Sequence, residues 1–402
     1  MVPLSRVTAA KQRIGPATGG VYIDKPMDPK RYRFASYCSS PAWGGLEMHV
    51  LRFLRWMSQR GWMAVLYGDP ATRLYQEATR AGIDTRSVVP HLRVGNFLSA
   101  GRLARLTKRD NVRWLIVHRS PDLFVGAFAR VFSGGRTRLI YHQHMHIGRD
   151  KKDPYHYWLY RRPDAFVTPV QWLADRVLEK TSVPKERLHV IPQGIETERL
   201  TTGKPDKAAA RARLGLPADA IVIGLVGRLD PKKGQDIAIE ALAQLRQSGR
   251  EPHLLLVGDQ SFAEGDTYTT LVHELVDRHH LHDLVHFVPH IDEVEYAYAA
   301  LDIFVLASKS ECYGMVTLEA MVSGLPVIGT NDGGTVSIID PGRNGLMVEP
   351  RNVAELVSAL TTLLDDPALR ARLGAAAHEE AIVKYSHVRQ CELWENLFER
   401  LG

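Results

Sequence analysis

The fold is decided by the stretch IVIGLVGRLDPKKG at residues 221–234. A short run of Val, Ile and Leu leads into a turn of Gly and Pro, and apolar residues with helical spacing follow. A buried strand that turns tightly into a helix is the repeating unit of parallel α/β sheets. The pattern therefore predicts a strand over 221–226 and a helix over 234–248.

The same alternation continues on both sides of this stretch. Before it, strands are expected over 33–38, 63–67, 114–118, 138–142, 165–168 and 188–191, and helices over 45–60, 72–81 and 171–180. After it, strands are expected over 253–257, 285–288, 303–306 and 326–330, and helices over 267–279, 315–323 and 388–401. A Pro-Gln-Gly turn at 192–194 separates the two series. The chain is thus predicted to form two α/β units, with the carboxyl ends of both sets of strands facing a cleft.

The length of 402 residues is enough for two or three domains with large cores. We expect an N-terminal extension over 1–30, a first domain over 31–197 and a second domain over 198–384. The final helix, within 385–402, has no strand after it and is expected to pack back on the first domain.

Composition excludes several classes of protein. Hydrophobic residues make up 45% of the chain and charged residues 24%, as in globular proteins. No apolar run approaches the roughly 18 residues needed to span a bilayer, and the N-terminus lacks the apolar segment of a secretory signal. The three cysteines form no disulfide framework. A cytoplasmic protein is expected, with a peripheral position at the inner face of the membrane as an alternative.

Charge is divided unevenly between the two halves. Residues 31–197 contain 27 basic and 13 acidic residues, a net charge of +14, whereas residues 198–384 contain 17 basic and 27 acidic residues, a net charge of −10. A basic half can meet phosphate, nucleic acid or an anionic membrane, or simply the acidic half. No aromatic platform or fold signal supports nucleic acid binding.

One basic segment is amphipathic and has two interpretations. Its apolar and basic residues interleave at Phe97, Leu98, Arg102, Leu103, Arg105, Leu106, Lys108 and Arg109. Such a segment can lie on an anionic membrane surface, or it can be a crossover helix whose apolar side covers the sheet. We favour the crossover helix.

The strongest candidate site is the stretch SKSECYGMVTLE at 308–319. Gly314 follows a strand and precedes a helix, so the amides of Met315 and Val316 are expected to point out of a helix N-terminus, where phosphate or a sugar hydroxyl can bind. Glu311 and Glu319 accept hydrogen bonds without donating any, which suits a polyhydroxyl ligand.

Two cations follow the strand at 221–226. Arg228 and Lys233 lie five residues apart in a Gly-rich turn, and together they can neutralise a diphosphate without a metal. Lys232 is adjacent to Lys233, and the spacing favours Lys233 as the residue that reaches the ligand.

A histidine cluster offers a different chemistry. In YHQHMH at 141–146, alternate residues of a strand share a face, so His142, His144 and His146 can line up as metal ligands, together with Asp150 or Asp153. A metal-dependent hydrolase is therefore the alternative of another class, although it leaves Arg228, Lys233 and the two glutamates without a role.

Taken together, the motifs resemble the retaining glycosyltransferases of family 4. The resemblance extends from about residue 33 onward and rests on Arg228 with Lys233, on the E-x₇-E pattern of Glu311 and Glu319, and on the stretches EAM (319–321), GLPVI (324–328), GG (333–334), NGL (344–346) and VIPQGI (190–195). It implies the GT-B architecture, in which two Rossmann-like domains face each other, the first binding the acceptor and the second the nucleotide-sugar donor.

The resemblance also implies roles for particular residues. Arg228 and Lys233 would hold the donor diphosphate, Glu311 the hydroxyls of the donor sugar, and Glu319 the nucleotide ribose. The backbone amides from Tyr313 through Gly314, Met315 and Val316 would cover sugar and phosphate, and His144 would lie beside the anomeric centre. Gly44 and Gly45, in WGGLE at 43–47, would let backbone approach the phosphates closely. One departure is that the glutamate often found in this family near the position of Ser337 is absent here.

The function that this implies is transfer of a hexosyl group from a UDP- or GDP-linked sugar to an acceptor hydroxyl, with retention of configuration and no metal. The acceptor would be a sugar, another small molecule or a lipid-linked molecule. Within the same architecture a nucleotide-sugar epimerase or a phosphorylase is the alternative, and a sugar-nucleotide-binding protein without turnover is another.

Overall fold

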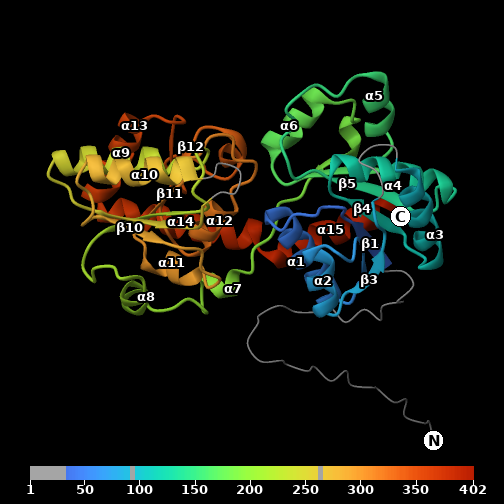
Figure 1. The fold of residues 1–402 in the computed structure, drawn as a ribbon, viewed down its shortest axis with the longest axis horizontal. Coiled ribbons are helices and arrows are strands. Elements are labelled where there is room, and N and C mark those ends of the chain that lie inside the picture. Colours follow the sequence, from blue (N-terminus) through green and yellow to red (C-terminus); the bar gives the residue numbers. More distant parts are fainter. Residues whose placement is uncertain (1–32, 91–95, 261–265) are drawn as a thin grey trace, which may run out of the picture.

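The computed structural model describes residues 33–90, 96–260 and 266–402, and contains two parallel sheets, each covered by helices on both faces (Figure 1). The expected extension over 1–30 lies outside the described residues. No helix of the described part of the chain is both long and apolar enough to cross a membrane.

The first sheet has the strand order β3-β2-β1-β4-β5-β6-β7, and the second has the order β10-β9-β8-β11-β12-β13. The strands of the first sheet are β1 (Arg33–Tyr37), β2 (Met63–Gly68), β3 (Asp84–Ser87), β4 (Trp114–Val117), β5 (Arg138–His142), β6 (Ala165–Thr168) and β7 (Leu188–Val190). Those of the second are β8 (Val222–Val226), β9 (His253–Val257), β10 (Val285–Val288), β11 (Ile303–Val305), β12 (Val327–Thr330) and β13 (Leu346–Val348).

Helices α1 to α6 and α15 cover the first sheet, and the others cover or flank the second. The helices of the first half are α1 (Gly45–Gln59), α2 (Arg73–Arg80), α3 (Phe97–Arg109), α4 (Ser120–Phe132), α5 (Pro154–Tyr160), α6 (Gln171–Lys180) and the 3-10 helix η1 (Lys185–Arg187). Those of the second half are α7 (Thr197–Leu200), α8 (Lys207–Leu214), α9 (Gln235–Gln247), α10 (Asp266–Arg278), α11 (Glu295–Ala300), α12 (Met315–Val322), η2 (Gly333–Ser337), α13 (Val353–Asp365), α14 (Pro367–Tyr385) and α15 (His387–Leu401).

The expected strands are all present, with bounds that differ by one residue at most, because their apolar runs are buried on both faces as parallel strands require. The pattern did not reveal β3 or β13. The strand β3 reads DTRS and lies at an edge of its sheet, where its side chains are only partly buried, and β13 has three residues. Neither carries the apolar run by which the other strands were found.

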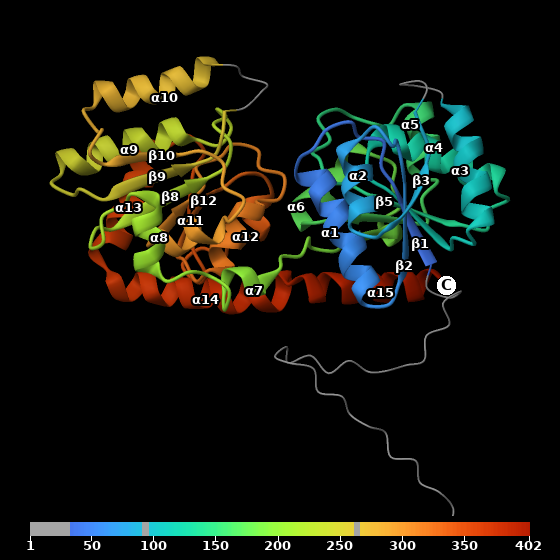
Figure 2. The same ribbon diagram turned by 60° about the horizontal axis from the view of Figure 1, so that its bottom comes forward.

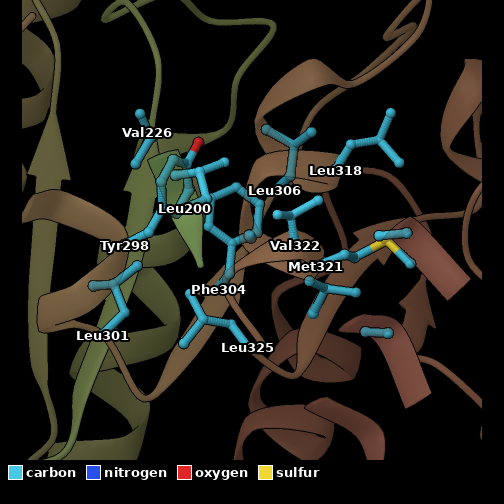
Figure 3. Close-up of a cluster of buried hydrophobic side chains, with 14 of the residues drawn as sticks. Leu200, Val226, Tyr298, Leu301, Phe304, Leu306, Leu318, Met321, Val322 and Leu325 are labelled. Atoms are coloured by element: carbon cyan, nitrogen blue, oxygen red, sulfur yellow. The ribbon is translucent and has the colours of Figure 1, made fainter. Parts of the chain in front are cut away.

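The core of the second domain shows how its helices are held to the sheet. Tyr298 from α11, Phe304 from β11 and Met321 from α12 are all buried in one cluster (Figure 3). Because this cluster fixes α12 against β11, it also fixes the loop between them, which contains Glu311.

The last helix of the chain belongs to the core of the first domain. In Figure 2, α14 runs beneath the second domain and α15 continues beneath the first. Trp394 and Phe398 of α15 are fully buried, and the ring of Phe398 stacks on Trp114 of β4 with centroids 4.9 Å apart. Residues at the far end of the sequence therefore cover one face of the first sheet, beside α1.

The two chain crossings between the domains are hydrogen-bonded to each other. The amide of Ile195 donates to the carbonyl of Tyr385 (2.8 Å), and the amide of His387 donates to the carbonyl of Ile195 (2.9 Å). A Cβ atom on Gly194 would lie 2.5 Å from Cα of His387, which is closer than real Cβ contacts allow. The crossings can approach this closely only because residue 194 is glycine.

We expect Gly194→Ala to lower the free energy of unfolding by about 1–3 kcal/mol, because the added methyl group meets backbone that cannot rotate away. Gly101→Ala in α3 is the matched control, since a Cβ there meets nothing within 4 Å and alanine favours the helix. Urea denaturation of both variants measures the difference. Equal stability of the two variants would show that the close crossing is not a constraint.

Candidate functional site

The candidate site lies where the strand order of each sheet reverses direction. In the second sheet this point lies between β8 and β11, and in the first it lies between β1 and β4. Parallel α/β sheets bind ligands at the carboxyl ends of the strands that flank such a point. The loop with Arg228 and Lys233 follows β8, and the loop with Glu311 follows β11, so four of the expected residues (Arg228, Lys233, Glu311 and, on the next helix, Glu319) gather around one switch point.

The two loops meet through an ion pair. Nζ of Lys233 donates to Oε2 of Glu311 at 2.5 Å, and both side chains are about one-fifth exposed. Lys232 is exposed and makes no ion pair among the described residues. The Arg228 side chain is also exposed, with no carboxylate partner in the described part of the chain. The geometry thus brings Lys233, rather than Lys232, to the carboxylate, and leaves the cation of Arg228 available to an anion.

Glycines allow the loops to pack this tightly. A Cβ on Gly234, the residue before α9, would lie 2.2 Å from the carbonyl oxygen of Ala307, and one on Gly333 would lie 2.2 Å from that of Glu311. Both have positive φ angles (79° and 66°), which glycine adopts without strain. The backbone of the Glu311 loop therefore packs directly against the backbone of Gly333 and Gly334.

The N-terminus of α12 begins at Gly314, whose φ of 88° turns the chain from the loop into the helix. Amides in the first turn of a helix have no acceptor within it, and here those of Met315 and Val316 follow directly after the Glu311 loop. Further along α12, Oε2 of Glu319 accepts a hydrogen bond from the Tyr298 hydroxyl at 2.8 Å. Burial raises the pKa of the Glu319 carboxyl.

Gly44 and Gly45 begin α1 at the carboxyl end of β1, in the first domain. The Gly44 amide donates to the Glu47 carboxylate at 2.9 Å. A Cβ on Gly45 would meet nothing within 4 Å, and one on Gly44 would make only an ordinary contact with that carboxylate. The folded protein itself thus imposes no requirement for glycine at either position.

Four buried imidazoles lie beneath the carboxyl edge of the first sheet: His49, His118, His142 and His144. The Gln193 side-chain amide donates to Nδ1 of His144 (2.8 Å), so Nε2 of His144 is protonated and donates to Nδ1 of His118 (3.1 Å). Nε2 of His118 then donates to Oγ of Ser36 (3.2 Å). Both ring nitrogens of His144 are occupied within the protein.

The predicted alignment of His142, His144 and His146 is wrong for His146. The group whose ligating atoms lie within 4.8 Å of one another is His118, His142 and His144. His146 is exposed and packs on the ring of Trp172, because the chain leaves the strand after His142 and no longer alternates. Asp150 pairs with Lys180, and Asp153 caps α5, so neither joins the group. A metal bound to His118 and His144 would have to replace the hydrogen bonds that they already make.

The linker contributes a residue that the sequence did not single out. Gln193 binds His144 through its side chain, and its carbonyl accepts a hydrogen bond from the buried Tyr313 hydroxyl at 2.7 Å. Gln193 thereby joins the Glu311 loop of the second domain to the histidines of the first. His118 was also missed, although its position directly after β4 at the switch point was a signal that could have found it.

Ser337 forms a second contact between the domains. Its hydroxyl accepts a hydrogen bond from the amide of Trp172, in the first turn of α6, at 3.2 Å. This is the region where the sequence lacks the expected glutamate, and the smaller side chain serves here as an acceptor for a helix N-terminus of the other domain.

Two family models match the chain. The one described as Glycosyltransferase Family 4 covers residues 43–199, and the one described as Glycosyl transferases group 1 covers residues 206–380. The chain belongs to glycosyltransferase family 4. The two matches correspond to the two sheets, and the break between them falls at the linker that contains Gln193.

Curated relatives of this chain include D-inositol 3-phosphate glycosyltransferases. That of Stackebrandtia nassauensis is 34% identical over 224 residues, which cover 54% of this chain and 50% of that protein. That of Nocardia farcinica is 33% identical over 285 residues, which cover 69% of this chain and 60% of that protein. The match thus spans only about half the length of the first of these relatives.

Solved structures share the fold over nearly the whole chain. HepE of Anabaena, solved in complex with UDP, has a TM-score of 0.81 and 22% identity, and covers 92% of this chain and 100% of its own. A glycosyltransferase from Rickettsia africae has a TM-score of 0.83 and 18% identity, and covers 92% of this chain and 98% of its own. The fold is GT-B, as the resemblance implied.

The buried histidines predict acid sensitivity. Burial lowers the pKa of all four rings, that of His144 to about 3, whereas each is about 6.5 in the unfolded chain. The unfolded state therefore binds more protons below pH ~6.5, and the free energy of unfolding should fall by about 1 kcal/mol per histidine between pH ~7.5 and ~5.5.

Substituting one ring tests this origin. Neither nitrogen of His142 has a partner among the described residues, so His142→Phe should reduce the loss between these two pH values by about 1 kcal/mol, whatever its effect on stability at neutral pH. His282→Gln, at an exposed histidine, should leave the loss unchanged. Denaturant titrations at both pH values give the comparison, and identical losses in the two variants would contradict it.

Proposed function

We propose that this glycosyltransferase moves a hexosyl group from a nucleoside diphosphate sugar to an acceptor hydroxyl with retention of configuration. The observation that carries the proposal is the Lys233–Glu311 pair beside the N-terminus of α12, at the switch point of the second sheet. A cation, a carboxylate and free helix amides within one loop pair suit a ligand that has both phosphate and sugar hydroxyls.

The diphosphate would be neutralised by Arg228 and Lys233. Arg228 is exposed at this site without a carboxylate partner, and Lys233 is already held within the site by Glu311. Two cations and the positive end of α12 would stabilise the charge that develops on a departing diphosphate, which is the main electrostatic requirement of the reaction. We therefore expect no metal to be required.

The two glutamates would bind different parts of the donor. Glu311 lies in the loop beside Lys233, where the sugar would follow the phosphates, and it would accept hydrogen bonds from hexose hydroxyls. Glu319 lies further along α12 and would accept from the nucleotide ribose. Gly44 and Gly45 would approach the phosphates from the first domain, which is consistent with the lack of any need for glycine in the folded protein itself.

The reaction would proceed by attack on the face from which the diphosphate departs. The bond between the anomeric carbon and the phosphate oxygen breaks, the acceptor oxygen forms the new bond, and the leaving phosphate takes the proton of the acceptor hydroxyl. Glu311 is engaged with Lys233 and is assigned to sugar binding rather than to nucleophilic attack. In this mechanism the protein contributes mainly by positioning the substrates and stabilising the leaving charge.

His144 would support the donor sugar from the first domain. Because both of its ring nitrogens are already hydrogen-bonded to the protein, contact with the sugar requires one of these bonds to be exchanged when the donor binds. The low pKa caused by burial keeps the ring neutral, so it can orient a hydroxyl but adds no positive charge.

The names of relatives suggest classes of substrate. HepE has been solved with UDP and with UDP-glucose, which favours a UDP-linked hexose as donor. The relatives named D-inositol 3-phosphate glycosyltransferase suggest a phosphorylated polyol as acceptor. A nucleotide-sugar epimerase would instead consume the donor when no acceptor is present, and a binding protein would form no product with any acceptor, so product analysis with and without acceptors separates these possibilities.

Replacing Arg228 or Lys233 by Ala should weaken binding of the nucleoside diphosphate at least about tenfold, because each change removes a charge-assisted contact contributing about 1.5–3 kcal/mol. Lys232→Ala is the matched control in the same loop and should have a much smaller effect. Thermal shift in the presence of UDP and GDP measures binding.

A chelator added to a transfer assay tests the expectation that the reaction needs no metal. EDTA should leave transfer activity unchanged. Loss of activity with EDTA and its recovery with Zn²⁺ would contradict the proposal and favour the hydrolase built on His118, His142 and His144.

The two carboxylates should be separable by ligand. Glu311→Ala should impair binding of the nucleotide sugar while leaving binding of the free nucleoside diphosphate nearly intact, whereas Glu319→Ala should weaken both. Glu319→Gln keeps an acceptor for the Tyr298 hydroxyl and controls for loss of packing. Titration calorimetry with UDP and UDP-glucose gives both affinities. Equal losses across both ligands would show that this division of roles is wrong.

A further inference from the structure

Helices α3 and α4 lie on the outer end of the first domain, away from the second domain (Figures 1 and 2), and together they carry a ridge of exposed apolar residues. It consists of Phe97 and Leu98 at the start of α3 and Val131 and Phe132 at the end of α4, and we call these four residues the α3–α4 ridge. These residues are 50%, 73%, 54% and 53% exposed, respectively. The Phe128 ring joins the two ends of the ridge, with centroids 4.8 Å from Phe97 and 6.1 Å from Phe132. Exposed large apolar residues gathered on two packed helices in this way mark an interaction site.

Unpaired basic side chains surround the ridge. Leu98, Arg102 and Arg105 are spaced to share one face of α3, and both arginines are exposed. Lys108 on the same helix and Arg136 after α4 are also exposed. Within the described part of the chain, none of these four cations has a carboxylate partner. The charge is therefore available to an external anion, and it lies within the half of the chain that has a net charge of +14.

A polar pocket of about 460 Å³ lies beside the ridge. Its walls include Lys108 from α3, Ser133 directly after Phe132, and the basic residues Arg113, Arg136 and Arg138. Arg138 is paired with Asp164, but Lys108 and Arg136 are not paired with any described carboxylate. Because Ser133 directly follows Phe132, the pocket adjoins the Phe132 end of the ridge, an arrangement that suits a phosphorylated headgroup whose acyl chains lie against the ridge.

We propose that the α3–α4 ridge docks this protein on an anionic phospholipid bilayer. Leu98, Phe97, Val131 and Phe132 enter the interfacial region, and Arg102, Arg105, Lys108 and Arg136 contact lipid phosphates. Insertion of apolar side chains and attraction to lipid phosphates both favour binding to such a surface. Contact of the same cations with another basic surface would be repulsive. The outer end of the first domain would then face the membrane.

The mode of docking differs from that of a free amphipathic helix. Leu103, Ala100 and Ala104 are buried against the sheet, as the crossover interpretation of this segment required. Only the first turn of α3 presents apolar side chains outward, and α4 supplies the rest. The membrane would therefore meet the surface of a folded domain, and docking needs no helix to detach.

Cosedimentation of the full chain with phospholipid vesicles tests the proposal. Binding should require phosphatidylglycerol in phosphatidylcholine vesicles, and it should weaken as salt rises from about 0.1 M to about 1 M, where screening becomes complete within about 3 Å. Leu98→Ser/Val131→Ser should reduce the partition coefficient at least about tenfold. Arg102→Ser/Arg105→Ser should reduce it by a similar factor, at roughly fivefold per basic side chain.

Matched changes on the second domain serve as controls. Val383→Ser, at a 65% exposed apolar residue of α14, and Arg278→Ser/Arg372→Ser should leave vesicle binding unchanged. The thermal shift with UDP should be the same in all of these variants, so a failure of the nucleotide proposal is seen separately.

Three results would overturn the proposal. The first is negligible cosedimentation with acidic vesicles at low salt. The second is an equal loss of binding in the control variants. The third is a dimer in sedimentation velocity that Leu98→Ser/Val131→Ser dissociates while no vesicle binding occurs, because the ridge would then be an interface between two copies of the chain.

Discussion

The close pairing of two chain crossings at Ile195 and Ser386 is the constraint on which the arrangement of this protein depends. The linker passes from the first domain to the second, and the chain returns some 190 residues later to add α15 to the first domain. Because the crossings are hydrogen-bonded to each other beside Gly194, the linker and the returning chain are held together where they pass between the two domains. A change in the angle between the domains would have to be absorbed by the few loop residues at these two crossings, which is the usual design of a hinge.

Linker residues at these crossings also contact residues of the candidate site. The Gly194 amide donates to the Gln390 side chain, whose amide group lies 3.2 Å from Nε2 of His49. One residue earlier, Gln193 joins Tyr313 of the second domain to His144 of the first. A rotation of one domain relative to the other would therefore strain or break hydrogen bonds to the buried histidines. These imidazoles are neutral, because burial lowers their pKa and strongly disfavours the protonated ring.

The second domain presents its charges in a different way. Lys233 and Glu311 lie on loops, and these loops are supported by close glycine contacts at Gly234 and Gly333 and by the buried cluster around Phe304. Lys233 and Glu311 are consequently held before any ligand arrives, and little side-chain entropy remains to be lost when a diphosphate sugar binds. Long charged side chains, which are flexible in an open loop, are thus held in one arrangement by the packing of the loops.

The sequence by itself predicted eleven of the thirteen strands that the structure describes, about half of its helices, and the positions of the loops that carry Arg228, Lys233 and Glu311. Arg228, Lys233, Glu311 and Glu319 were placed correctly relative to their strands because a parallel strand, its turn and its helix are local, and their order along the chain fixes the edge of the sheet at which a loop emerges. Lys233 was favoured over Lys232 by spacing, but only the contact with Glu311, 78 residues away, distinguishes them in the structure.

Only the tertiary structure decided which distant residues meet. The sequence predicted that His146 lies beside His142 and His144, but the structure has His118 in that position. His118 follows β4 and His144 follows the neighbouring parallel strand β5, so these two residues meet although they are 26 positions apart. The pairing of Gln193 with His144, and the separation of the α3 segment into buried Leu103 and exposed Leu98, were likewise outside the reach of local pattern. Periodicity reports which residue types share a face, whereas the partner of that face is set by packing between elements far apart in the chain.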